Sequence, residues 1–120
     1  MDFVRAIDLY KKNPSEEHLR LLADELISEM TLEEKAAHYD AMAVKYFTRN
    51  EGYQVSRELR KYGDLESGWL PNSDNDGLFT GLYCASQCFR YAVTGSAEAK
   101  ANAKKAVEAM IKLTEITGKK

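Results

Sequence analysis

The sequence predicts an all-α fold of antiparallel helical hairpins, with four main helices and one short helix before them. Apolar residues recur at three- and four-residue spacing in five segments, which is the period of an amphipathic helix. Gly, Pro, Ser and Asn separate these segments. The segments span residues 2–12, about 16–30, 32–47, 78–93 and 97–117. A chain of 120 residues has the usual length of one domain, so we expect residues 1–120 to form a single helical domain.

The charge balance narrows the classes of partner. The chain has 17 Lys and Arg against 19 Asp and Glu, a net charge of -2, and the two signs are mixed along the sequence. No basic face typical of nucleic-acid binders is visible, and no apolar run is long enough for a bilayer span. We therefore expect neither nucleic acid nor a membrane as a partner. The first residues lack the features of a signal peptide, which leaves the compartment unknown and an extracytoplasmic parent protein possible.

Start signals support the second and third helices. Pro14, followed by the acids Glu16 and Glu17, is typical of a first helical turn. Thr31 and Glu34 have the spacing of a capping box, in which each side chain bonds the backbone N–H of the other residue. The residues expected to face inward from the third helix are Leu32, Ala36, Tyr39, Ala43 and Tyr46 or Phe47.

Residues 48–76 form a long irregular connection. The apolar periodicity weakens there, and several glycines and Pro71 interrupt it. Within it, Val55 to Tyr62 has enough apolar character for a turn or two of helix. A connection of this length in a compact domain is more often functional than idle.

The last two helices are predicted to form a tight hairpin. Gly95 suits the left-handed residue that ends a helix, and Ser96 suits the cap of the next one. Residues 78–93 carry a single charge, Arg90, so we expect this helix to be buried on several sides and its Cys84 and Cys88 to be buried thiols. The final helix has one apolar stripe, made of Ala99, Ala103, Ala106, Met110 and Leu113.

The polar loop of residues 72–77 has three possible interpretations. In the first, Asn75 or Asp76 caps the following helix and Gly77 lets the backbone turn. In the second, Asn72, Asp74 and Asp76 occupy the first, third and fifth positions of a calcium loop. The twelfth position would then be Tyr83, where that pattern requires Glu.

The third interpretation is a ligand-binding or catalytic site. Asp74 and Asp76 are candidate catalytic residues, because two nearby carboxyl groups can divide the roles of acid and base or can orient sugar hydroxyls. Asn75 lies between them, and Thr80 and Tyr83 would extend the polar rim one turn deeper. Trp69 is either a platform for sugar stacking or a lid over the core. No cofactor-binding motif is present, and no dedicated metal ligands are expected.

Four segments resemble a known family in their order along the chain. They are Thr31 to Ala37, Asp74 to Thr80, Phe89 to Gly95, and Ile116 to Gly118. Together they are similar to the opening portion of bacterial (α/α) toroid domains of the six-hairpin glycosidase type. The most similar of these are poorly characterised, and some accompany regulator-type β-propellers. The resemblance covers residues 31–118, and Asp-Asn-Asp-Gly-Leu-Phe-Thr is its most specific part.

The resemblance implies a fold and a type of ligand. In such toroids inner and outer helices alternate, and Asp74, Asn75 and Asp76 would face a central cleft that holds carbohydrate. The chain has only part of a toroid's helices, so we expect it not to be catalytic alone. We expect it to self-associate or to join the remainder of a larger toroid. The alternatives are a stand-alone helical-bundle module for protein interaction and a calcium-binding loop.

Overall fold

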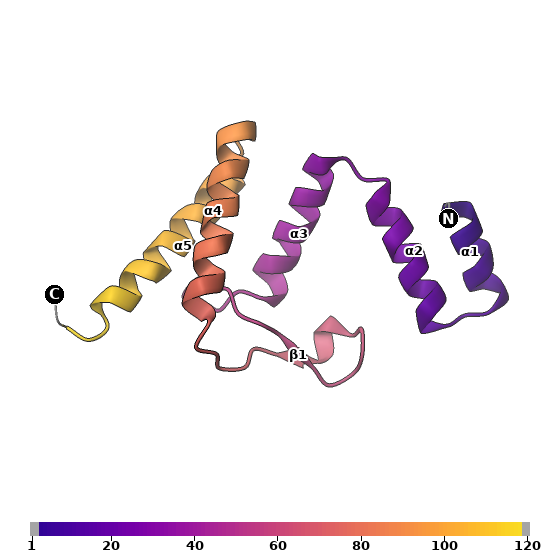
Figure 1. Ribbon diagram of the computed structural model, residues 1–120, viewed down its shortest axis with the longest axis horizontal. Coiled ribbons are helices and arrows are strands. Elements are labelled where there is room, and N and C mark those ends of the chain that lie inside the picture. The colour runs from indigo at the N-terminus through magenta and orange to yellow at the C-terminus, as the bar shows by residue number, and fades with distance from the viewer. Residues whose placement is uncertain (1–2, 119–120) are drawn as a thin grey trace. The chain divides into compact units, whose positions relative to one another are not determined.

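The computed structural model describes residues 3–118, which form five α-helices and one very small sheet (Figure 1). The helices are α1 (Phe3–Lys12), α2 (Glu16–Ser28), α3 (Leu32–Tyr46), α4 (Asp76–Thr94) and α5 (Ala97–Glu115). Helix α1 packs on α2, and α4 packs on α5. The all-α class with antiparallel helical hairpins is therefore confirmed. Residues 1–2 and 119–120, including the first residue of the segment predicted at 2–12, lie outside the described part.

Contacts within the chain divide it into two compact units, Met1–Tyr39 and Asp40–Lys120. The first unit contains the α1–α2 hairpin and the opening turns of α3. The second contains the rest of α3, the long connection and the α4–α5 hairpin. No helix within residues 3–118 is long and apolar enough to cross a membrane.

Side-chain caps begin α2 and α3. Ser15 Oγ accepts a hydrogen bond from the His18 N–H at 3.1 Å and so caps α2. At α3, Thr31 Oγ1 accepts from the Glu34 N–H at 3.2 Å, and Glu34 Oε2 accepts from the Thr31 N–H at 2.8 Å. The predicted capping box is thus confirmed. The hydrogen bond from the Thr31 backbone lowers the pKa of Glu34 because it favours the carboxylate.

The connection between α3 and α4 is folded around one arginine. Strand β1 (Glu58–Leu59) pairs antiparallel with β2 (Gly68–Trp69), and the short 3-10 helix η1 (Leu65–Ser67) lies between them. The Arg57 guanidinium donates to three backbone carbonyls, those of Leu65 at 2.8 Å, Tyr46 at 3.1 Å and Gly68 at 2.9 Å. The helical turns predicted for residues 55–62 were wrong, because residues 58–59 pair with β2 and the Arg57 contacts fix the backbone around them.

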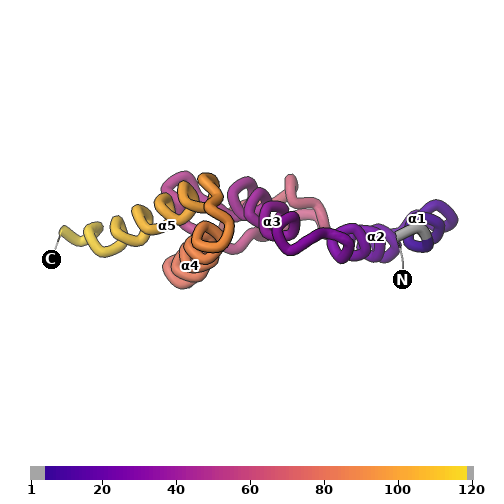
Figure 2. Tube along the Cα trace, turned by 90° about the horizontal axis from the view of Figure 1, so that it is seen from above, coloured from indigo at the N-terminus to yellow at the C-terminus, as the bar shows by residue number. Residues whose placement is uncertain are grey.

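The turn between α4 and α5 follows its sequence signals. Gly95 adopts φ +69 and donates its N–H to the Tyr91 carbonyl at 2.8 Å, and Ser96 Oγ accepts from the Ala99 N–H at 3.2 Å. Both predicted roles are confirmed. The two helices run side by side in both views (Figures 1 and 2). The buried residues of α5 are all alanines: Ala99, Ala103, Ala106 and Ala109. Leu113, which was expected on this stripe, is 44% exposed.

Helix α4 is buried on one side only, so the expectation of burial on several sides was wrong. Its buried residues are Thr80, Cys84 and Gln87, whereas Cys88 is exposed. Leu78, Leu82, Phe89 and Val93 are 60%, 64%, 72% and 85% exposed. The apolar composition of a helix does not reveal where its neighbours lie, and here they cover the side that carries small and polar residues.

Helix α3 also differs from its predicted orientation. Leu32 and Tyr39 were expected to face inward, but they are 84% and 52% exposed. The buried residue of α3 is the charged Asp40. An ion pair with Arg90 of α4 explains its burial, because a charge removed from water requires a partner.

Candidate functional site

An open groove of about 940 Å³ lies in the second unit, where the loop before α4 approaches the end of α5. Three segments line it. They are residues 49–53 after α3, the loop and first turn of α4, and the last turn of α5. The lining residues are Arg49, Glu51, Tyr53, Asn72, Ser73, Asp74, Asp76, Gly77, Lys112, Leu113, Glu115 and Ile116.

The loop that forms one wall is held in part by short-range hydrogen bonds. Ser73 Oγ accepts from the Asn75 N–H at 3.1 Å, and the Asn75 carbonyl accepts from the Phe79 N–H at 3.0 Å. Asn75 occupies the capping position of α4, but its side chain makes no capping hydrogen bond. Its backbone angles, φ -95 and ψ 1, differ from the extended conformation that directs a capping side chain onto the helix. The predicted side-chain cap is therefore not formed by Asn75.

Asp76 begins α4, and its side chain turns toward Arg49. The distance from Arg49 Nε to Asp76 Oδ2 is 3.5 Å, and both side chains are largely buried. The same guanidinium donates through Nη2 to the Pro71 carbonyl, which ties the loop to the end of α3. The other oxygen, Asp76 Oδ1, is buried and accepts no hydrogen bond among residues 3–118. The groove therefore contains an anchored ion pair with an unused acceptor.

The remaining lining combines charge, an aromatic ring and apolar surface. Asp74 is exposed on the loop, and no hydrogen bond or ion pair joins its side chain to another residue of the described part of the chain. Tyr53, from the segment after α3, is half-buried. Lys112 and Glu115 contribute opposite charges from α5, next to the exposed Ile116. Such a surface offers both donors and acceptors to a polar ligand, together with apolar contact area.

Thr80 lies directly beneath this wall and has a structural position. It is 0% exposed, its Oγ1 donates to the Asp76 carbonyl at 2.6 Å, and it accepts from the Gln54 N–H at 2.9 Å. These two bonds connect the first turn of α4 to the segment after α3. Thr80 therefore supports the groove from behind and does not line it.

Tyr83 lies at a second, smaller cavity of about 70 Å³, which is lined also by residues of α3, α5 and the segment 52–54. Its hydroxyl is buried and has no hydrogen-bond partner among the described residues. Burial, with a smaller effect from Asp40, raises the pKa of Tyr83 to about 12. Trp69 lies elsewhere, on β2, with the Arg60 guanidinium 5.6 Å from its ring centre.

The groove thus brings together two of the six residues proposed from the sequence, Asp74 and Asp76, while Asn75, Thr80, Tyr83 and Trp69 do not line it. It adds Arg49, Tyr53, Lys112 and Glu115, which sequence reasoning did not select for the site. Arg49 belongs to a basic cluster that is visible in the sequence of the connection. No sequence signal marks the end of α5 as part of a site.

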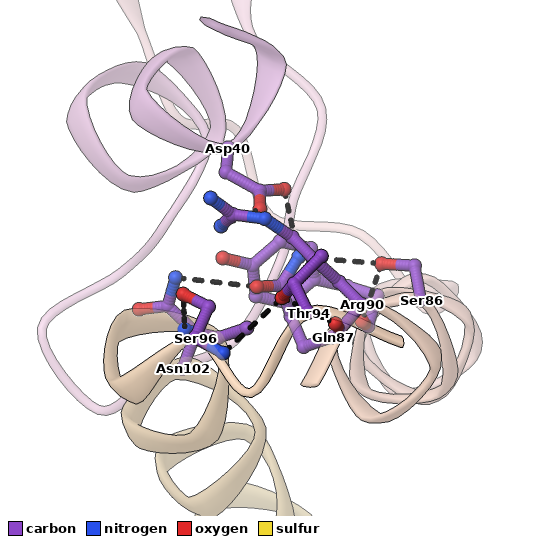
Figure 3. Close-up of polar contacts among 9 residues, drawn as sticks. Asp40, Ser86, Gln87, Arg90, Thr94, Ser96 and Asn102 are labelled. Carbon is purple, nitrogen blue, oxygen red and sulfur yellow. Dashed lines mark hydrogen bonds and ion pairs between the residues drawn. The ribbon is translucent and has the colours of Figure 1, made fainter. Parts of the chain in front are cut away.

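A buried polar network joins the last turns of α3 to the α4–α5 hairpin (Figure 3). Arg90 Nη1 lies 2.6 Å from Asp40 Oδ2, and Gln87 Nε2 donates to Asp40 Oδ1 at 2.7 Å. Gln87 Oε1 accepts from Asn102 Nδ2 at 3.3 Å, which extends the network to α5. These contacts hold together three helices of the unit that contains the groove.

Between residues 3 and 118, no group of three His, Cys, Asp or Glu side chains gathers closely enough to hold a metal ion. Calcium binding by Asn72, Asp74 and Asp76 therefore stays a prediction from spacing alone. No protein-family model matches the chain, and comparisons with curated proteins and with solved structures give no match either.

Proposed function

We propose that this protein is a carbohydrate-binding helical-hairpin domain of the (α/α) toroid type, which binds its ligand in the groove beside Asp74 and Asp76. The supporting observation is that both aspartates line the same groove of about 940 Å³, as the resemblance to six-hairpin glycosidases leads one to expect of residues beside a cleft. The volume lies within the range typical of small-ligand sites.

The chemistry of the lining suits a sugar. Carboxylates such as Asp74 accept hydrogen bonds from hydroxyl groups, and the guanidinium of Arg49 can donate to a hydroxyl or ring oxygen. The Tyr53 ring offers a flat apolar surface with a polar edge, which matches one face of a pyranose. The groove is therefore suited to a ligand that has hydroxyl groups and an apolar face.

Charge further restricts the class of sugar. The lining carries four acids (Glu51, Asp74, Asp76 and Glu115) and two bases (Arg49 and Lys112), so its formal charge is 2 − 4 = -2. An acidic sugar would be repelled by this excess of carboxylates. The proposed ligand is thus a neutral oligosaccharide.

Binding without hydrolysis is the activity proposed for the chain alone. Glycoside hydrolysis requires two carboxyl groups on opposite sides of the scissile bond, one of them able to donate a proton. Asp74 and Asp76 belong to one short loop, and Asp76 already pairs with Arg49. A second carboxyl group from another hairpin would be needed to complete such a pair.

The test is a titration of the full chain with neutral oligosaccharides, in which binding is measured by changes in the amide chemical shifts. We expect shifts to concentrate at residues 72–77 and 112–116. Asp74→Ala should weaken binding at least tenfold, because it removes an acceptor, while Glu58→Ala, an exposed carboxylate on β1 outside the groove, should leave affinity unchanged. Absence of shifts with every neutral oligosaccharide at millimolar concentration, or equal effects of the two variants, would refute the proposal.

A further inference from the structure

One wall of the groove is a tight turn that follows α3, here called the 49–53 turn. Within it the Arg49 N–H donates to the Tyr53 carbonyl at 2.9 Å, and the Gly52 N–H donates to the Arg49 carbonyl at 2.8 Å. Arg49, Glu51 and Tyr53 line the groove. Gly52 instead lines the smaller cavity of about 70 Å³. The turn therefore separates the two cavities, and Gly52 does not face the groove.

Gly52 is the point at which this turn meets α5. It is buried and adopts φ +103, a backbone conformation that favours glycine. A Cβ atom at this position would lie 2.9 Å from Lys105 Cγ, 3.0 Å from the Lys105 carbonyl oxygen and 3.5 Å from Ala109 Cβ. The lysine side chain can move aside, but the carbonyl belongs to the backbone of α5 and moves only with the helix. Glycine therefore lets the turn approach α5 more closely than a residue with a side chain would.

The side of α5 that receives the turn continues into the groove. Lys112 and Ile116 follow Ala109 by three and seven residues, so all three lie on the same side of the helix. Lys112 and Ile116 both line the groove. The distance between the turn and α5 at Gly52 therefore sets how far Tyr53 stands from the opposite wall.

The other supports of the turn come from α4 and the loop before it. Arg49 bonds to that loop and pairs with Asp76 at the start of α4. The Gln54 N–H, next to the turn, donates to Thr80 of α4 at 2.9 Å. These bonds hold the turn to α4, whereas the close contact at Gly52 seats it on α5.

We propose that Gly52 is a positioning residue that sets the width of the groove and so holds Tyr53 against the ligand, an inference that rests on the proposed binding of oligosaccharide in this groove. Gly52 does not line the groove, so it acts on a ligand only through its neighbours in the turn. A side chain at this position would push the turn away from α5 and widen the groove. A ligand that touches both walls then loses contact with one of them, because dispersion attraction falls steeply with distance.

The position of the turn is tested first in the full chain without ligand. In Gly52→Ala, an undisplaced turn would place the new methyl group 3.5 Å from Ala109 Cβ and give a strong nuclear Overhauser effect between the two methyl groups. We expect this signal to be weak or absent, because the Lys105 carbonyl forces the turn outward. Circular dichroism checks that the variant keeps its helices.

The effect on binding is measured by titration with cellohexaose and maltohexaose. Gly52→Ala should weaken binding about tenfold, which corresponds to the loss of one aromatic contact. The matched control is Gly63→Ala. Gly63 also has a positive φ, +73, but nothing lies within 4 Å of a Cβ placed there. The control imposes a similar backbone strain without displacing the turn, so it should leave the affinity unchanged.

A double-mutant cycle separates positioning from a general loss of stability. In a Tyr53→Ala background, Gly52→Ala should cost little further affinity, because the ring that Gly52 positions is no longer present. Two residues that act independently would instead give additive losses of binding free energy. Additive losses would therefore contradict the proposal.

Three further results would overturn it. They are a strong methyl–methyl signal in Gly52→Ala, an unchanged affinity of that variant, and an equal loss of affinity in Gly63→Ala. If neither hexasaccharide binds the unmodified chain, the carbohydrate proposal fails, and the role of Gly52 in ligand binding fails with it. The methyl–methyl signal still decides separately whether Gly52 places the turn, so the two failures are distinguishable.

Discussion

Arg90 on α4 and Asp40 on α3 form an ion pair of 2.6 Å, 50 residues apart in the sequence, with side chains only 13% and 12% exposed. Gln87 donates to the second carboxylate oxygen of Asp40, so both oxygens have partners. Burial of two charges is costly, and it is tolerated only while each retains its partner. The stability of the second unit should therefore depend on this pair.

Replacing Arg90 with Met should destabilise the second unit by about 3–5 kcal/mol, because Asp40 would stay buried without its counter-charge. The double variant Asp40→Leu with Arg90→Met should recover much of the loss, since neither charge remains. Urea unfolding followed by the fluorescence of Trp69, the single Trp of the chain, reports on this unit. If Arg90→Met is as stable as the unmodified chain, the pair does not stabilise the unit.

Replacing Thr80 with Val should lower the free energy of unfolding by about 1–3 kcal/mol, because the Gln54 N–H loses its buried acceptor. Thr80→Ser retains the hydroxyl and should restore most of that bond. The two variants are compared by the same unfolding measurement. Equal loss in both would mean that packing of the Thr80 methyl group, and not the hydroxyl, is decisive.

Replacing Arg57 with Met should increase the mobility of the connection between α3 and α4. The guanidinium donates to three carbonyls, and each bond from a charged donor contributes about 1.5–3 kcal/mol. Hydrogen exchange should become faster at residues 58–69 and stay unchanged in the α4–α5 hairpin. Glu58→Gln is a control on the same segment. Unchanged exchange in the Arg57 variant would contradict this role.

Stability should fall at high pH because of Tyr83. Its pKa in the folded chain is raised from 10.0 to about 12, so the unfolded chain loses this proton first. The contribution of Tyr83 to the free energy of unfolding is fully present below pH 10 and is lost as pH rises toward about 12. In this range the folded state binds more protons than the unfolded state. Absorbance at 295 nm of the chain minus that of Tyr83→Phe should show a step near pH 12. A step near pH 10 would mean that folding does not raise the pKa of Tyr83.

Tyr83→Phe should also be at least as stable as the unmodified chain at neutral pH. The Tyr83 hydroxyl is buried without a hydrogen-bond partner among the described residues, so its removal relieves a desolvation cost. A clear loss of stability in this variant would instead indicate a hydrogen bond to the hydroxyl in solution.

The candidate site was only partly predictable. The loop with Asp74 and Asp76 stood out because two acids and a glycine precede a strongly apolar helix. Arg49 and Tyr53 lie more than 20 residues earlier in the sequence, and Lys112 lies more than 30 residues later. Only the packing of α5 against α4 and the Arg49 contacts with Asp76 and Pro71 bring these side chains to one groove.

The sequence by itself determined where helices begin and end. The Thr31–Glu34 capping box and the Gly95–Ser96 junction depend on hydrogen bonds between residues at most four positions apart, so local pattern was sufficient. The tertiary structure decided which side of each helix is buried. Asp40 faces inward because Arg90 lies opposite, and Phe89 faces outward because α5 occupies the other side of α4. Burial depends on neighbours that are distant in sequence, whereas a cap depends on the next turn.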